Sequence, residues 1–285
     1  MPNFPIVDTH LHLWDTSLFH YPWLDAIPSL NLPHLPCDYA RECGSVAVEA
    51  MVFVQCETEI CAFRDEAKWV AEQAKHEPRI KGMVAWAPLE NGRAVDVDLA
   101  GLAHYEILRG IRRIIQSEDD IDFCLQPSFI EGVRTLASFG LTFDICIDHR
   151  HMKNIIKFAS MLPEVSMVLD HIGKPPIKEG LIMPWANQLR ELARLPHVFC
   201  KISGVATEAD HGRWSADDLK RYIEVAIDAF GFDRIMFGTD WPVATQAIAV
   251  GRWVRLLDEV MADANEIEQR KFWRDNATRF YRLGI

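Results

Sequence analysis

The sequence predicts a single-domain (β/α)8 barrel, the TIM-barrel fold, over residues 1–285. Short β-branched or aromatic runs alternate with longer helical patterns, eight such runs occur, and no polar linker or internal repeat divides the chain. Strand and helix in alternation imply a parallel sheet, and eight units imply that the sheet closes. The alternative is an open doubly wound sheet, but the glycine-rich turn that usually follows its first strand is replaced here by HLHLWD.

Each of the eight apolar runs is predicted to form one strand of the barrel. Their short length and their content of β-branched and aromatic residues are typical of strands. The runs occupy residues 5–10, 48–55, 80–86, 108–114, 141–147, 165–170, 197–203 and 233–239.

Helical patterns separate most of these runs. The clearest patterns lie at residues 62–76, 127–139 and 215–230. Ser215 followed by Asp218 is typical of an N-cap with an acidic first turn. Gly140 and Gly231 each close a helical pattern just before the next strand, as glycines at helix C-termini do.

Residues 15–45 interrupt the alternation of strands and helices. This stretch contains the tripeptide YPW and several prolines, so we predict an extended loop there. Loops of this length inside a compact domain are commonly functional, and we expect this one to cover the mouth of the barrel.

Composition and charge exclude several classes of function. The chain is 49% hydrophobic, which is enough for a large core, and its net charge of -11 with no basic block argues against nucleic acid as a partner. No signal-peptide pattern and no apolar run of membrane-spanning length occur, so we expect a cytoplasmic protein that does not engage membranes. The seven cysteines form no CxxC pair. The sequence leaves the oligomeric state open.

Four residues of catalytic type lie at the ends of predicted strands. His10 and His12 stand on alternate positions at the end of the first strand, so their side chains share one face. His171 follows the sixth strand, and Asp240 follows the eighth. Because the carboxyl ends of the strands in a parallel barrel build the active site, we expect these four side chains to meet at one rim.

Each candidate also has a purely structural explanation. His171 alone could be a hydrogen-bonded turn residue, and Asp240 could cap the following helix. Asp144, on the fifth strand, could pair with Lys201 of the seventh strand for structure only. Taken together, however, catalytic-type residues at three strand ends favour an active site over these separate explanations.

Six segments spread over nearly the whole chain resemble the lactonase branch of the amidohydrolase superfamily. They are DTHLHLWD, YPW, GIRRIIQ, LDHIGKP, CKISG and MFGTDWP. The first strand of this superfamily carries HxH, and the eighth ends in a catalytic aspartate. The branch contains 2-pyrone-4,6-dicarboxylate lactonase and sugar lactonases such as the L-fucono- and L-rhamnono-lactonases.

The resemblance implies a hydrolase whose partner is a small lactone. Asp240 would activate a water molecule, while His10, His12 and His171 surround the carbonyl oxygen. A sugar-acid lactone of the L-fucono-, L-galactono- or L-rhamnono type is favoured, because a dicarboxylate lactone would demand more arginines than the pair on the fourth strand. Candidates for substrate contact are Arg112, Gln116, Asp144 and Lys174, with Trp14, Trp23, Trp86 and Trp241 as walls.

The same resemblance limits the metal content of the site. Binuclear members of the superfamily use a carboxylated lysine or a glutamate on strand four and a histidine on strand five. Here strand four offers Arg112, Arg113 and Gln116, and strand five reads FDICI, so a two-metal centre is not expected. His10, His12 and Asp240 could hold one Zn²⁺ or Mn²⁺, or the site could work without metal. No organic cofactor is implied.

Three other functions stay open at this point. A metal-dependent decarboxylase of an unsaturated or aromatic carboxylic acid would need zinc held by the three histidines and Asp240. A lactone isomerase would pass through related tetrahedral species. A non-catalytic carbohydrate-binding barrel would have no use for a poised base.

Overall fold

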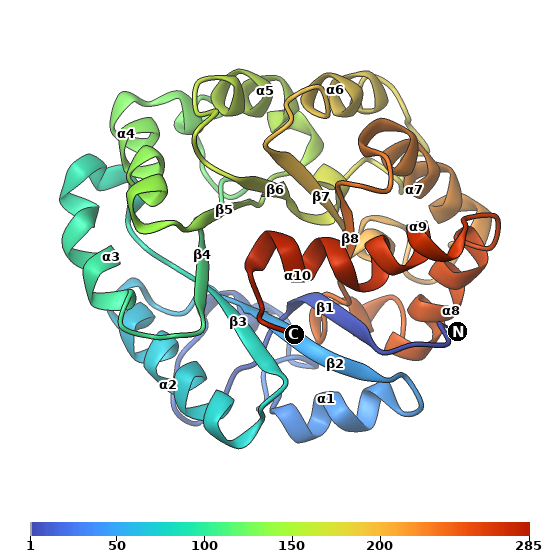
Figure 1. The fold of residues 1–285 in the computed structure, drawn as a ribbon, viewed down its shortest axis with the longest axis horizontal. Helices are drawn as coiled ribbons and strands as arrows, with labels where there is room; N and C mark the ends of the chain where they lie inside the picture. Colours follow the sequence, from blue (N-terminus) through green and yellow to red (C-terminus); the bar gives the residue numbers. More distant parts are fainter. Residues whose placement is uncertain (1) are drawn as a thin grey trace.

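The computed structural model describes residues 2–285 and contains one eight-stranded parallel sheet, in the order β1 to β8 (Figure 1). The strands are β1 Ile6–Leu11, β2 Val48–Val54, β3 Ile80–Ala85, β4 Leu108–Arg112, β5 Thr142–Ile145, β6 Met167–Leu169, β7 Val198–Ile202 and β8 Ile235–Phe237. Each strand lies within one of the eight predicted runs except β1, which extends one residue further to Leu11, and the predicted barrel is confirmed.

The barrel closes where β1 meets the segment that follows β8. The backbone nitrogen of His12 donates to the carbonyl of Trp241 at 2.7 Å, and that of Asp240 donates to the carbonyl of His10, also at 2.7 Å. Thr9 Oγ1 donates to the carbonyl of Phe237 at 2.6 Å. These bonds attach Asp240 directly to the HxH segment, although more than two hundred residues separate them.

Asp8 strengthens this junction and takes no part in the cavity above it. Its carboxylate accepts hydrogen bonds from the backbone nitrogen of Thr239 at 2.9 Å, from Thr239 Oγ1 at 2.5 Å and from Tyr39 Oη at 2.7 Å. Because burial without partners would be costly for a carboxylate, these three donors make its position tolerable.

Helices follow the strands and surround the sheet (Figure 1). They are α1 Pro36–Cys43, α2 Phe63–His76, α3 Asp96–Leu102, α4 Pro127–Thr135, α5 Met152–Ser160, α6 Trp185–Leu192, α7 Ala216–Phe230, α8 Val250–Val260, α9 Glu266–Arg270 and α10 Asn276–Tyr281. The predicted cap of α7 is present, since Ser215 and Asp218 form a reciprocal capping box. Gly140 and Gly231 both have a positive φ at helix ends.

The C-terminal helices α9 and α10 lie across one end of the barrel (Figure 1). Phe280 and Tyr281 pack in one apolar cluster with inward-facing strand residues, among them Val7 and Ala50 near the starts of β1 and β2. The amino-terminal end of the barrel is therefore closed, and a ligand can enter only from the carboxyl-terminal end.

The segment 15–45 is not an extended loop throughout. Residues 36–43 form α1, with Pro36 at the first helical position, where its missing N–H costs nothing. The remaining part passes over the mouth of the barrel, where Trp23 Nε1 donates to the carbonyl of Cys56 at 2.8 Å. Within residues 2–285, no helix combines the length and apolar character needed to cross a membrane.

Candidate active site

The polar residues inside the barrel form two layers. On β1, β5 and β7 the inward-facing positions come in pairs two residues apart, because alternate side chains of a strand share a face. His10, Asp144 and Lys201 belong to the lower layer and are fully buried. The upper layer carries the residues two positions further on, which are His12, Cys146 and Ser203.

The lower layer is a network of buried charges that compensate one another. Lys201 Nζ lies 2.6 Å from Asp144 Oδ2 and 3.1 Å from Asp170 Oδ1. Tyr281, from α10, donates its hydroxyl to Asp144 Oδ2 at 2.7 Å. Burial alone would lower the pKa of Lys201, but Asp144 and Asp170 outweigh it and raise the pKa above its ordinary value. The lysine therefore stays charged.

His10 connects this network to the residues above it. Arg112 Nη1 lies 3.3 Å from His10 Nε2, and because an arginine can only donate, Nε2 must accept. The proton of the neutral ring then sits on Nδ1, which lies 3.2 Å from Asp170 Oδ1. Burial and the nearby Lys201 hold the pKa of His10 well below its ordinary value, so the ring is neutral.

His12 and Asp240 meet directly above His10. His12 Nδ1 donates to the carbonyl of Val54 at 2.8 Å, which leaves Nε2 unprotonated in the neutral ring. This nitrogen lies 3.4 Å from Asp240 Oδ1, and His10 Nε2 lies 3.7 Å from the same oxygen. Burial lowers the pKa of His12. The lone pairs of His10 Nε2 and His12 Nε2 thus face the carboxylate of Asp240, and a proton or a cation between these three atoms would stabilise the arrangement.

His171 completes the group from the opposite side, on a left-handed backbone with φ of 53°. Its Nδ1 lies 3.0 Å from Ser203 Oγ, and its ring centroid lies 4.4 Å from that of His10. Burial holds the pKa of His171 well below its ordinary value. Burial opposes ionisation of Asp240, but its interactions with the imidazoles of His171 and His12 and with the Lys174 ammonium lower the pKa of this carboxyl, and Lys174 supplies that attraction while both rings are neutral.

Gly204 makes the close approach of His171 and Asp240 possible. A Cβ atom at this position would lie 2.6 Å from His171 Nδ1 and 2.7 Å from Asp240 Oδ2. The residue also has a φ of 59°, which L-amino acids with a side chain rarely adopt. Glycine is therefore the residue that this position requires.

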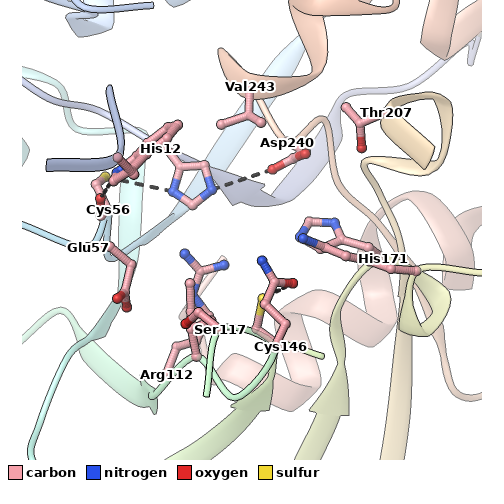
Figure 2. A pocket seen from close by; sticks show the side chains of 14 residues that line it. His12, Cys56, Glu57, Arg112, Ser117, Cys146, His171, Thr207, Asp240 and Val243 are labelled. Carbon is pink, nitrogen blue, oxygen red and sulfur yellow. Dashed lines mark hydrogen bonds and ion pairs between the residues drawn. The ribbon is translucent and has the colours of Figure 1, made fainter. Parts of the chain in front are cut away.

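A cavity of about 270 Å³ opens above these residues at the carboxyl-terminal end of the barrel (Figure 2). Its lining comes from loops after most of the strands and from the 15–45 segment. The lining residues are His12, Trp23, Cys56, Glu57, Arg112, Ile114, Gln116, Ser117, Cys146, His171, Lys174, Thr207, Asp240 and Val243. His10 lies beneath the lining and contacts it through Arg112, His12 and Asp240.

Three of the predicted substrate contacts, Arg112, Gln116 and Lys174, line this cavity. Arg113, the alternative on strand four, points outward and pairs with Glu90 at 3.2 Å and Glu118 at 2.6 Å. The fourth predicted contact, Asp144, does not line the cavity, since it lies in the lower layer.

Of the four predicted aromatic walls, only Trp23 lines the cavity. Trp14 is fully buried and donates its indole N–H to the carbonyl of Leu32 at 2.9 Å. Trp86 packs on Phe63, with ring centroids 4.9 Å apart. Trp241 packs on His34 and Tyr39, with centroids 5.4 Å away in each case. These three tryptophans support the rim from behind.

The acidic and polar lining residues that sequence reasoning did not identify include Glu57 and Thr207. Glu57 follows β2, and Thr207 follows β7. Both come shortly after strand ends, so the rule that identified His171 and Asp240 would have identified them had it been applied to every strand.

The donor set fits one divalent cation. Ligand atoms of His10, His12 and Asp240 all lie within 4.8 Å of one another and are buried, and neutral imidazole with carboxylate suits Zn²⁺ or Mn²⁺. A second set, His10, Asp170 and His171, meets the same distance criterion. We favour the first set, because Asp170 is already paired with Lys201.

Known proteins resemble this chain along nearly its whole length. The amidohydrolase family profile matches residues 7–283. The L-fucono-1,5-lactonase of Burkholderia multivorans is 32% identical, with 97% of this chain and 96% of the relative covered. The L-fucono-1,5-lactonase of Burkholderia ambifaria is 29% identical, with 97% and 95% covered.

A crystal structure from B. multivorans, described as an amidohydrolase with bound zinc, superimposes with a TM-score of 0.88. It is 31% identical in sequence, and the match covers 98% of this chain and all of that one. The fold, the matching family profile and the full-length relatives lead to one conclusion: the chain belongs to the amidohydrolase family.

Proposed function

We propose that this protein is a lactonase that opens a neutral sugar-acid lactone, an aldonolactone of the L-fucono-, L-galactono- or L-rhamnono type, to the aldonic acid. The observation that carries the proposal is the carboxylate of Asp240 at the floor of a small cavity, 3.4 Å from His12 Nε2 and in the same lining as His171. The names of the two Burkholderia relatives support the same substrate class.

The first chemical step requires a base and a site for the negative charge that develops. A water molecule attacks the acyl carbon and gives its proton to Asp240, while the carbonyl oxygen becomes an oxyanion. Arg112 and Lys174, which line the same cavity, supply positive charge for that oxygen, and His171 can donate one hydrogen bond.

The second step breaks the ring. As the tetrahedral intermediate collapses, the bond between the acyl carbon and the ring oxygen breaks, and Asp240 returns its proton to the leaving oxygen. The product carries a carboxylic acid and one new hydroxyl, and the acid then releases its proton to the solvent, so atoms and charge balance with one water consumed. When bound to His10, His12 and Asp240, a divalent ion supplies Lewis acidity and lowers the pKa of water.

The cavity suits a ligand of this size. Its volume of about 270 Å³ lies just below the roughly 300–1,000 Å³ of sites for larger ligands, and Trp23 offers an apolar face to a sugar ring.

All seven cysteines are free, which supports the cytoplasm as the compartment.

The proposal is tested with a panel of aldono-1,4- and 1,5-lactones, including L-fucono-, L-galactono- and L-rhamnono-lactone. Acid release is followed with a pH indicator, with and without a chelator. We expect acid release from at least one of these three. Ring migration without acid release would instead indicate an isomerase, and carbon dioxide from an unsaturated acid, lost on chelation, would indicate the decarboxylase.

A further inference from the structure

Glu57 presents a negative charge to the cavity without a cation of its own. The residue is half-buried, lines the cavity beside Cys56, and lies on the side away from His171 (Figure 2). Within residues 2–285 it forms no ion pair with any lysine, arginine or histidine. An acidic side chain of this kind in a cavity is available to a ligand.

The backbone and a buried neighbour hold this side chain in place. Glu57 has a φ of 54°, a conformation that costs a residue with a side chain free energy and persists only when its surroundings enforce it. The fully buried Gln55 provides that enforcement, since its side chain donates to Glu57 Oε1 and accepts from the backbone nitrogen of Glu57, each at 2.6 Å.

Gln55 in turn is anchored to the catalytic residues. Its carbonyl accepts a hydrogen bond from Arg112 Nη2 at 2.6 Å. Glu57 Oε1 is therefore occupied, whereas Oε2 accepts no hydrogen bond from any of residues 2–285. A carboxylate oxygen can only accept, so the ligand group that suits Oε2 is a hydroxyl.

We propose that Glu57 determines specificity: its Oε2 accepts a hydrogen bond from a substrate hydroxyl, and its charge disfavours lactones that carry a second anionic group. This inference rests on the proposed lactonase function. Arg112 and Lys174 are the cations of the lining, and both are already in use: Arg112 lies beside Asp170 and donates to the Gln55 carbonyl, and the oxyanion of the reacting ester takes the charge that remains. Lys174 serves the single carboxylate that every lactone hydrolysis produces.

The test compares a neutral aldonolactone with an aldaric-acid monolactone, which carries a free carboxylate on a similar hydroxylated ring. Glu57→Gln keeps the size of the side chain and an oxygen for Gln55, but removes the charge. We expect a KM for the neutral lactone about tenfold higher, since hydrogen bonds to charged groups are worth about that factor, with kcat within about threefold. The ratio of kcat/KM for the anionic over the neutral lactone should rise at least about tenfold.

Two further variants make the result specific. Glu59→Gln removes an equal charge two residues away, where the side chain is exposed and pairs with His20. It should change neither KM for the neutral lactone nor the ratio of kcat/KM for the anionic over the neutral lactone. Glu57→Asp keeps the charge but shortens the side chain by one methylene group. KM for the neutral lactone should therefore rise, and kcat/KM for the anionic lactone should not increase. Thermal unfolding of each variant establishes that it is folded.

The outcomes separate the inference from the function on which it rests. If the wild type hydrolyses neutral lactones and neither Glu57→Gln nor Glu57→Asp changes KM or the substrate ratio, Glu57 has no such role, and the lactonase function stands. If the wild type hydrolyses no lactone of either kind, both are overturned.

Discussion

The lower layer of the barrel and the cavity above it both contain carboxylates and histidines, but they differ in how the charges are balanced. Below, Lys201 lies against both Asp144 and Asp170, and Asp144 also receives the hydroxyl of Tyr281. Above, Asp240 faces unprotonated ring nitrogens, and Glu57 has a carboxylate oxygen with no donor among residues 2–285.

This difference separates structural charges from reactive ones. A buried charge that is fully paired contributes order and holds its neighbours in position, whereas a charge with free hydrogen-bonding capacity at a cavity can act on a ligand. The paired charges of Asp144, Lys201 and Asp170 therefore hold His10 in position, and under the proposed function the residues at the cavity perform the chemistry.

The largest expected effect comes from breaking the balance of the lower layer. Lys201→Met leaves the buried carboxylates of Asp144 and Asp170 without their cation, which should lower the free energy of unfolding by about 3–5 kcal/mol. Adding Asp144→Asn to this variant removes one uncompensated charge and should restore part of the loss. Chemical denaturation measures both. A decrease below about 1 kcal/mol in the single variant would mean that the lower layer is not a compensated network.

A smaller effect should follow from crowding the upper layer. Gly204→Ala places a methyl group against His171 and Asp240, and we expect kcat to fall about 100-fold, as misplacement of reacting groups by an ångström does. Gly140→Ala is the matched control, because Gly140 has a similar φ of 64° but no atom within 4 Å of its added Cβ. Both should lose similar stability from backbone strain. Equal kcat in the two variants would show that the added methyl group at Gly204 does not disturb the reacting groups.

The smallest effect concerns Glu66, a buried acid of α2 that has no paired cation within residues 2–285. Its carboxylate accepts from the backbone nitrogen of Cys56 at 3.2 Å, and burial raises its pKa to about 8. Between pH 4.5 and 8 the folded protein therefore keeps a proton that the unfolded chain has released, so this group makes stability fall as pH rises.

Glu66→Gln should abolish that dependence. Relative to the variant, the wild type should lose on the order of 2 kcal/mol of unfolding free energy between pH 5 and pH 7. Denaturant unfolding of both proteins at the two pH values measures the difference. If the difference in unfolding free energy between wild type and variant is the same at both pH values, Glu66 is ionised in the folded protein. A buried carboxylate without a paired cation would then be stable in this barrel.

The alternation of strands and helices predicted the fold, and the residues that end each predicted strand indicated which side chains converge. This works because the carboxyl ends of all strands in a parallel barrel lie at the same rim. His10, His12, His171 and Asp240 were found in this way. Depth inside the barrel was not predictable in the same manner. Asp144 faces inward as expected, but it lies one layer lower than Cys146, and the order of layers depends on the stagger of neighbouring strands.

The tryptophans and Glu57 show two further limits. Trp14 and Trp241 lie in irregular segments beside the rim, where no periodicity tells which way a side chain points, and both turn into packing. The helix α1 was hidden among prolines, since Pro36 occupies a helix start and not a break. Glu57 depends on a left-handed backbone and on Gln55, neither of which is visible without coordinates.

The most direct test is the turnover of a hydrolysable aldonolactone by Asp240→Asn, with the wild type beside it at the same pH. The asparagine cannot take a proton from water, so kcat should fall about 10³–10⁴-fold, while KM changes less than about tenfold and the thermal midpoint stays near that of the wild type. A folded variant that keeps more than a tenth of the wild-type rate would show that some other group removes the proton.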